Sequence, residues 1–541
     1  MIIYFYLISF SLIGYGLLIS QFLRINISDF GNLGILGITF LSIISYSTSL
    51  FLNHGILLNS FILFLGIFLF FLFIKKINNL KKEIILLFLI FSLLIIFILI
   101  AKNHDDFSYY HFPYSIFLTE FSHPIGFGNL NNGFRSPSSI FFINSMFYLP
   151  GVNYFLFHFA AAYLFGFANL ILLKFTFDKE IFTSKKFINF LSLISLIFIN
   201  IFFYRLAEHG TDRSGMILTI ILVIYLLSLT NNIKDNIEKN TEILKIFLVY
   251  TFFVITIKPF FLINFIFIFV LFFYNQLRKI FLQLFFTPTF YYCFLLLFFT
   301  IFYTFLNSSC FIFPITFTCL ESLSWSLDID NIKDVNVWFE LWSKAGATPN
   351  FVVENRIEYI QGLNWLSNWI ENYFFNKVSD FILGILFLVV VIYLSFFGKK
   401  VISTSVKTNF LLVYLCLLFL FFEWFFFHPA LRYGGYHVIA LLFFIPVCLE
   451  LSKKKLDFEK YSKGAFVLLL ITSIVFISRN ALRLEKEIVK YNYNPLKNIK
   501  YKFIGGNKEY YFRHNIQMRE NINAIDSKNF LGKKIYITKF N

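Results

Sequence analysis

The chain has 541 residues, of which 58% are hydrophobic and 14% are charged, whereas soluble domains carry about 25% charged residues. Its mean hydropathy is +0.74, which excludes a soluble enzyme, a disordered protein and a DNA-binding factor. The composition predicts an all-α integral membrane protein, because each run of about 20 apolar residues forms one membrane-spanning helix.

The net charge of +16 comes from 46 Lys and Arg residues against 30 Asp and Glu residues. Most of the basic residues lie in short loops between apolar runs. This distribution is typical of cytoplasmic loops of membrane proteins, which are rich in Lys and Arg, and differs from a nucleic-acid-binding patch. We therefore expect membrane lipids as partners and no nucleic acid.

The apolar runs predict about fourteen membrane spans and no cleaved signal peptide. These runs cover residues 1–23, 31–52, 56–74, 84–101, 153–173, 187–204, 214–230, 244–257, 260–277, 285–306, 379–397, 409–427, 437–451 and 464–478. Basic loops follow every second span, beginning with the loop around Lys75 and Lys76. All of these loops can lie in the cytoplasm together, which puts the N-terminus and the long loops 102–152 and 307–377 outside.

The C-terminal residues 481–541 form a small tail that this topology sends outside, although Arg479, Arg483 and Lys486 directly after the last span favour the inside. Strand-like segments at 501–504 and 534–538, with a Gly505-Gly506 turn, predict a small α/β unit. The side of the membrane on which the tail lies stays open.

Acids and histidines gather in the loops that this topology places outside. Asp105 and Asp106 end the fourth span, where a carboxylate can act as a general base, and His104 and His111 lie nearby. A divalent metal, Mg²⁺ or Mn²⁺, is a candidate cofactor, with His104 and Asp106 as candidate ligands. The alternative is that Asp106 caps a following helix.

Residues 107–121 are aromatic and only mildly polar. This composition predicts a helix that lies in the membrane interface, and the alternative is a linker pressed against the helix bundle. An interfacial helix beside an acid would suit a site that receives a lipid-borne substrate.

Three further external segments carry candidate binding residues. Opposite charges that follow the sixth span could bind a substrate or simply pair with one another. Lys258, before Pro259, is a candidate counter-charge for a phosphate, unless it only snorkels to the membrane edge. The candidates in these segments are Arg205, Glu208, His209, Asp212, Lys258, Arg432, Tyr433 and Tyr436.

Arg432 carries a bidentate donor that matches a phosphate or pyrophosphate. The glycines at 434 and 435 would let the backbone approach a ligand, and the alternative is a tight external turn. Glu423, inside an apolar run, needs a partner, for which Arg432 is a candidate.

Cys310 and Cys319 share the large external loop, which permits one disulfide. The sequence contains no P-loop and no G-x-G-x-x-G motif.

Taken together, the segments 103–114, 208–212, 258–259 and 429–434 resemble those of the GT-C superfamily of polytopic membrane glycosyltransferases. The resemblance implies that Asp105 or Asp106 is the catalytic base and that Arg432, Lys258 and Arg205 hold the phosphate of a polyprenyl-linked sugar donor. In that superfamily the acid follows the first span, whereas here it follows the fourth. Three additional spans keep the acid on the external side.

The resemblance implies extra transmembrane helices over 1–83, a catalytic core over 84–480 and a small soluble tail over 481–541. It further implies an inverting glycosyltransferase of the bacterial cytoplasmic membrane, active on the external side, with a glycan, lipid or protein as acceptor. One alternative is an O-antigen-type polymerase or ligase that depends on Arg432 and Arg205. Another is a flippase or transporter of lipid-linked sugars in which Glu423 and Lys258 line a path.

Overall fold

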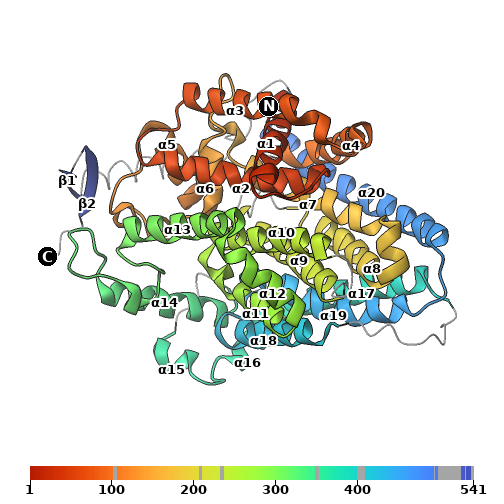
Figure 1. Cartoon of the computed structure of the whole chain (residues 1–541). Helices are drawn as coiled ribbons and strands as arrows, with labels where there is room; N and C mark the ends of the chain where they lie inside the picture. Colours follow the sequence, from red (N-terminus) through yellow and green to blue (C-terminus); the bar gives the residue numbers. More distant parts are fainter. Residues whose placement is uncertain are drawn as a thin grey trace.

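The computed structural model of the chain describes residues 1–100, 106–205, 210–231, 237–347, 353–398, 409–492, 494–496, 525–530 and 532–537. These residues form a helical bundle with a single two-stranded sheet near the C-terminus (Figure 1). The α-helices are α1 (Ile2–Phe22), α2 (Phe30–Ser49), α3 (Ile56–Phe73), α4 (Leu80–Ile98), α5 (Phe112–Glu120), α6 (Ser139–Ser145), α7 (Phe159–Thr176), α8 (Lys179–Phe202), α9 (Gly210–Asn231), α10 (Ile237–Ile257), α11 (Ile266–Phe272), α12 (Asn275–Gln283), α13 (Pro288–Ser308), α14 (Ile329–Lys344), α15 (Arg356–Ile360), α16 (Leu366–Trp369), α17 (Ser379–Ser395), α18 (Leu411–Phe427), α19 (Gly435–Ser452) and α20 (Phe458–Tyr491).

Eleven helices among the described residues are long and apolar enough to cross a membrane, or twelve if one bent pair counts as a span. The prediction of a polytopic all-α membrane protein is therefore confirmed, but the count is lower than the fourteen expected. All fourteen apolar runs are helical. The shortfall arises because the first turn of α4 carries three charges, α18 has only 17 residues, and the run after α10 is broken.

The broken run consists of the helical turn η7 (Pro259–Phe265) and α11, followed by α12 at an angle of 118°. Together, η7 and α11 extend about 24 Å along the helix axis, because a 3₁₀-helix extends about 2.0 Å and an α-helix about 1.5 Å per residue. α12 buries Leu277 and Ile280 and exposes Arg278 and Lys279. This pattern is typical of a helix that lies along the membrane surface.

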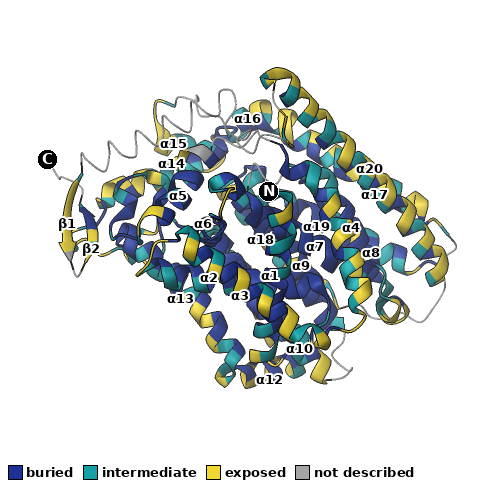
Figure 2. Ribbon diagram, turned by 90° about the horizontal axis from the view of Figure 1, so that it is seen from above, coloured by how far each residue is buried: buried dark blue, intermediate teal, exposed yellow. Residues whose placement is uncertain are grey.

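The outer helices expose apolar side chains, whereas the central helices are buried on all sides. Figure 2 shows buried residues along α7 and α9 and many exposed residues along α17 and α20. Phe387 on α17 is 72% exposed and Phe466 on α20 is 63% exposed. Exposed apolar helix faces of this kind are stable only in contact with lipid.

The basic loops contact one another at one end of the bundle. Lys174, in the last turn of α7, lies 2.9 Å from Asp29 before α2, and Lys245 on α10 donates to the carbonyl of Leu23 at 2.9 Å. At the opposite end, the amide of His123 donates to Ser49 and that of Gly126 donates to Leu306, both at 2.7 Å. The loops thus segregate into two ends as the alternating charge pattern predicts.

The first helices pack against the rest of the bundle at backbone distance. A Cβ atom added at Gly37 on α2 would lie 1.8 Å from the carbonyl oxygen of Leu12 on α1. Small residues permit this close packing of membrane helices. The hydroxyl of Thr39 on α2 lies 2.7 Å from that of Tyr292 on α13. The segment 1–83 is therefore an integral part of the bundle.

The aromatic segment after α4 forms the π-helical turn η2 (Phe107–His111) and then α5. Tyr114 is fully buried and bonds to Nε2 of His123 at 2.9 Å, and Ser115 donates to the carbonyl of Phe141 at 3.0 Å. α5 is therefore packed against the bundle, as in the alternative interpretation of residues 107–121. Its aromatic side chains pack within the end of the bundle opposite the basic loops, which we call the cap and which residues 106–157 and 309–347 form. In the same cap, a disulfide joins Cys310 and Cys319, as the sequence permitted.

The C-terminal hairpin of β1 (Asp526–Phe530) and β2 (Lys533–Ile537) lies at the same end of the bundle as the cap (Figure 1). The amide of Ile125 donates to Lys534, and the amide of Tyr536 donates to Ile125, both at 2.9 Å. The amino group of Lys533 donates to the carbonyl oxygens of Leu50 and His123. These contacts place the hairpin with loop 102–152. β2 overlaps the strand expected at 534–538, whereas 501–506 lies outside the described residues.

We predict that a cysteine at position 527 (Ser527→Cys), which is exposed on the hairpin, reacts with a membrane-impermeant maleimide in intact cells. A cysteine in the exposed basic loop after α3 (Lys76→Cys) serves as the matched control and should react only after permeabilisation. Mass spectrometry of the purified protein measures the labelling. Labelling of Lys76→Cys but not of Ser527→Cys in intact cells would contradict the topology, because the candidate site would then face the cytoplasm.

Candidate functional site

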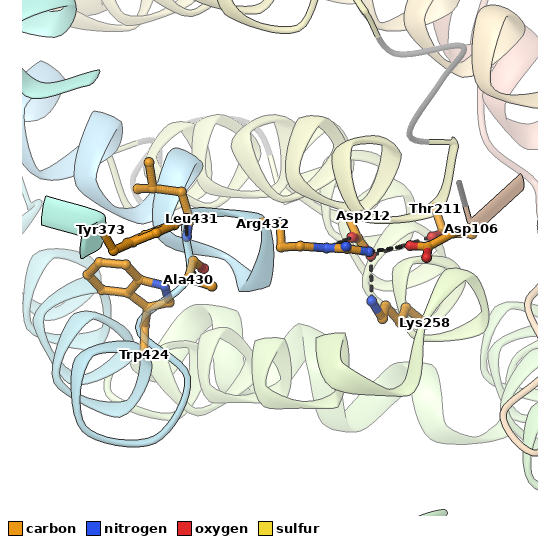
Figure 3. A network of polar contacts seen from close by, with 9 residues as sticks. All are labelled: Asp106, Thr211, Asp212, Lys258, Tyr373, Trp424, Ala430, Leu431 and Arg432. Atoms are coloured by element: carbon orange, nitrogen blue, oxygen red, sulfur yellow. Dashed lines mark hydrogen bonds and ion pairs between the residues drawn. The ribbon is translucent and has the colours of Figure 1, made fainter. Parts of the chain in front are cut away.

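Four charged residues from four separate segments meet at the end of the bundle opposite the basic loops. Asp106 precedes η2, Asp212 lies in the first turn of α9, Lys258 precedes η7, and Arg432 lies in the turn η11 (Leu431–Tyr433). The guanidinium of Arg432 donates through Nη2 to Asp106 at 2.6 Å and through Nε to Asp212 at 3.1 Å. Nζ of Lys258 donates to the other oxygen of Asp212 at 2.5 Å (Figure 3).

This four-residue network is balanced in charge and shielded from water. Asp212 is the most buried member, with 8% of its side chain exposed. The other three side chains are 27–29% exposed, so that one side of the network opens to solvent. Removing two carboxylates and two cations from water costs several kcal/mol per ion unless they pair closely, as they do here.

Aromatic rings surround the two cations. Nζ of Lys258 lies 5.2 Å and the guanidinium carbon of Arg432 5.6 Å from the centre of the Tyr433 ring. The Arg432 guanidinium also lies 5.5 Å from the ring centre of Trp342 on α14. Cation–π contacts at these distances hold both cations in place.

Three side chains position the backbone that carries Arg432. The indole of Trp424 donates to the carbonyl of Ala430 at 2.8 Å, and the hydroxyl of Tyr373 accepts from the amide of Leu431 at 2.9 Å (Figure 3). The indole of Trp369 donates to Pro429 at 2.9 Å. These bonds pre-organise the turn, so that Arg432 reaches the two carboxylates without further ordering.

The glycines after this turn serve packing rather than ligand access. Gly434 has φ of +102°, in the left-handed region that favours glycine. A Cβ atom at Gly435 would lie 2.6 Å from the Trp424 indole, so the close approach expected there is to a side chain of the protein itself. Glu423 was expected to pair with Arg432, but its carboxylate instead lies 3.9 Å from Nδ1 of His428.

Local electrostatics keep the titratable groups around the network in fixed states. Burial opposes the charge of Arg432, but Asp212 and Asp106 outweigh it and raise the pKa of its guanidinium above its ordinary value. Burial, reinforced by Asp106 and Asp212, raises the pKa of Tyr110, so that its phenol stays protonated. Burial, with Lys344 and Lys258 nearby, lowers the pKa of His428 to about 4, so that its imidazole is neutral at pH 7.

A second group of cations lies beside the network, around Tyr204 and Arg205. The guanidinium of Arg479 lies 3.7 Å and that of Arg483 5.5 Å from the centre of the Tyr204 ring. Arg205 lies close enough to Arg483 for their like charges to interact. Arg479 and Arg483 lie on α20, so this arginine group extends towards the end of that helix.

The structure brings together five of the residues that the sequence singled out, namely Asp106, Asp212, Lys258, Arg432 and Tyr433. Two others lie beside the neighbouring arginines: Arg205, and Tyr436, whose ring centre is 5.7 Å from the guanidinium of Arg213. His111 is buried against the rings of Tyr110 and Phe141. The remaining candidates lie outside the described residues; they are His104, Asp105, Glu208 and His209.

The described residues do not fit a divalent metal. Within this part of the chain, no group of three or more His, Cys, Asp or Glu side chains could hold a metal ion. The position between Asp106 and Asp212, where a metal would bridge two carboxylates, is taken by the guanidinium of Arg432. His104, the other candidate ligand, lies outside the described residues.

Two residues of the site were not predicted from the sequence. Trp342 covers Arg432, and Tyr110 lies close enough to Asp106 and Asp212 for their charges to raise its pKa. The spacing of Trp338 and Trp342 was an available signal, because residues four apart share one helix face. Tyr110 carried no such signal, since it is one of 30 tyrosines in the chain.

We predict that Asp212→Asn destabilises the protein by about 3 kcal/mol, because two partly buried cations then share one carboxylate. Asp330→Asn is the matched control, since this acid is 81% exposed and pairs only at the surface with Lys333. It should leave stability unchanged. Denaturant unfolding of the purified protein measures both variants, and equal losses would contradict the structural importance of the network.

Comparison with known proteins gives a family but no function. The profile of a family described as a domain of unknown function, DUF8201, matches residues 1–439. The match begins at the first helix and includes all four residues of the network. No curated protein and no solved structure matches the chain.

Proposed function

The chain belongs to the DUF8201 family, and we propose that it is a membrane glycosyltransferase of the bacterial cytoplasmic membrane. It would transfer a sugar from a polyprenyl-phosphate-linked donor to an acceptor of the cell envelope on the external side. The observation that supports this proposal is the network of Asp106, Asp212, Lys258 and Arg432 at the end of the bundle opposite the basic loops. It combines a carboxylate that can accept a proton with two cations that can hold a phosphate.

In the proposed reaction Asp106 is the general base. It accepts the proton of an acceptor hydroxyl while the hydroxyl oxygen forms a bond to the anomeric carbon of the donor sugar. The bond between that carbon and the phosphate oxygen breaks, and its electron pair leaves with the phosphate. A single displacement of this kind inverts the configuration at the anomeric carbon.

The ion pairs of the network suggest how the donor is accommodated. Arg432 and Lys258 are both neutralised by carboxylates in the absence of substrate. A donor phosphate would compete for the same guanidinium and ammonium groups, which bind phosphates strongly. As Arg432 turns towards the phosphate, its hold on Asp106 weakens, and the carboxylate becomes available to the acceptor hydroxyl. Donor binding would thus activate the base.

Asp212 has a different role in this proposal. It is more buried than Asp106 and is bonded to both cations. Its charge therefore fixes the positions of Lys258 and Arg432 and prevents their mutual repulsion. Asp212 is a positioning residue, and Asp106, at the more exposed edge, is the group that meets the acceptor.

The test uses cells that lack the protein and carry either the wild type or Asp106→Asn. We expect the Asn variant to lose about 10²-fold or more in transfer, because a general base contributes at least that factor. One sugar should then be missing from the surface glycans, and its polyprenyl-linked donor should accumulate. Mass spectrometry of glycans and lipids measures both. The exposed Asp330→Asn serves as the matched control and should behave as wild type.

If folded Asp106→Asn restores the wild-type profile, the acid is structural and the proposal fails. An altered chain-length distribution, without loss of a sugar, would favour an O-antigen-type polymerase. A lipid-linked sugar that accumulates only in the inner leaflet would favour a flippase or transporter. Asp105→Asn, made separately, shows whether the neighbouring acid contributes.

A further inference from the structure

α14 carries two tryptophans on the face that leads to the network. Asp334, Trp338 and Trp342 follow one another at intervals of four residues and therefore lie on one side of the helix. Trp338 is 47% exposed, although its helix belongs to a loop at the external end and carries several charges. Exposing a large aromatic ring to water is unfavourable, so this face favours a ligand.

The two rings form a continuous aromatic track from solvent to the charged network. Trp338 and Trp342 have ring centroids 6.4 Å apart, and their planes are inclined by 29°. The Trp342 ring continues to Tyr433 at 5.7 Å and lies against the guanidinium of Arg432. A ligand that stacks along this track is therefore led towards Asp106, which Arg432 holds.

The end of α14 is fixed, so that the track is preformed. Lys344 is almost fully buried and forms an ion pair with Glu340 at 2.5 Å. Its ammonium also donates to the carbonyl of Ile360 at 2.7 Å and lies 5.4 Å from the centre of the Trp365 ring. These contacts tie the helix to the following segment. Trp342 consequently keeps its position over Arg432, which lowers the entropy cost of binding.

The chemistry of the track fits a carbohydrate. A pyranose ring presents a flat face of C–H groups that stacks on an indole, and its hydroxyls bond to carboxylates at the edge of the ring. Asp334 supplies an exposed carboxylate on the same face. The ring centres of the two tryptophans lie 6.4 Å apart, a separation comparable to the length of one pyranose unit.

Other occupants fit the track less well. A lipid chain would need an apolar surround, whereas the exposed surface of α14 carries Asp330, Lys333 and Asp334. These three charges keep this part of the helix in water. The same charges argue against a tryptophan belt at the membrane interface.

We propose that the acceptor is a carbohydrate whose terminal rings stack on Trp338 and Trp342 and present a hydroxyl to Asp106. This inference rests on the proposed transferase, for which it names the acceptor class. The sugar-binding site itself does not depend on catalysis and can be measured without a donor.

The experiment uses the full-length protein in nanodiscs of phosphatidylethanolamine and phosphatidylglycerol, because the head groups of maltoside detergents would compete. Saturation-transfer NMR measures binding of cellotriose and chitotriose, two neutral oligosaccharides with flat C–H faces. We expect transfer to the ring C–H protons, about tenfold weaker binding in Trp338→Ala and near-normal binding in Trp338→Phe. Phe317→Ala is the control, since Phe317 is an 89% exposed aromatic residue in the same external loop.

The inference is overturned if the folded wild type binds neither sugar, or if Trp338→Ala binds both as well as the Phe317→Ala control. A second result would also overturn it. The fluorescence of Trp338 is the difference in emission between the wild type and Trp338→Phe, and quenching of this fluorescence by brominated lipids would mean that Trp338 lies in the membrane. If binding follows this pattern and no variant changes the cellular glycans, the sugar site stands while the proposed transferase fails.

Discussion

The bridge that Arg432 forms between Asp106 and Asp212 is the interaction on which the end of the bundle opposite the basic loops depends. The two bonds join residues 326 and 220 positions apart in the chain. None of these charges could be withdrawn from water alone, since an unpaired ion costs several kcal/mol to bury. The native packing at this end therefore requires η2, α9, η7 and η11 all to be in place, since the four charges lie in or directly before these elements.

This constraint also explains why the network suits a substrate with a phosphate. A site with two free cations would repel itself and bind any anion, whereas a neutralised pair admits only a ligand that replaces the carboxylates with good geometry. The aromatic walls of Trp342 and Tyr433 reduce access of water and strengthen these interactions. In the proposed reaction, a donor phosphate replaces the carboxylate as the partner of Arg432. This one exchange both selects the ligand and frees Asp106 to act as the base.

The sequence allowed the membrane class, the two ends of the bundle and all four charged residues of the network to be singled out, because each is encoded locally. Hydropathy reveals spans, and Asp106, Lys258 and Arg432 stand out as charges at span ends. Their pairing could not be read, since it depends on how distant helices pack. The spacing of Trp338 and Trp342 was visible in the sequence, but the contact of Trp342 with Arg432 was not, because it comes from the position of α14 over η11.

A double-mutant cycle of Asp106→Asn and Arg432→Gln tests the bridge most directly. Denaturant unfolding of the wild type, both single variants and the double variant gives the coupling free energy. The bridge predicts a coupling of about 2 kcal/mol, because each single change leaves an uncompensated charge that the double change removes. Single-variant effects that add within about 0.5 kcal/mol would show that the two residues do not interact and would contradict the account.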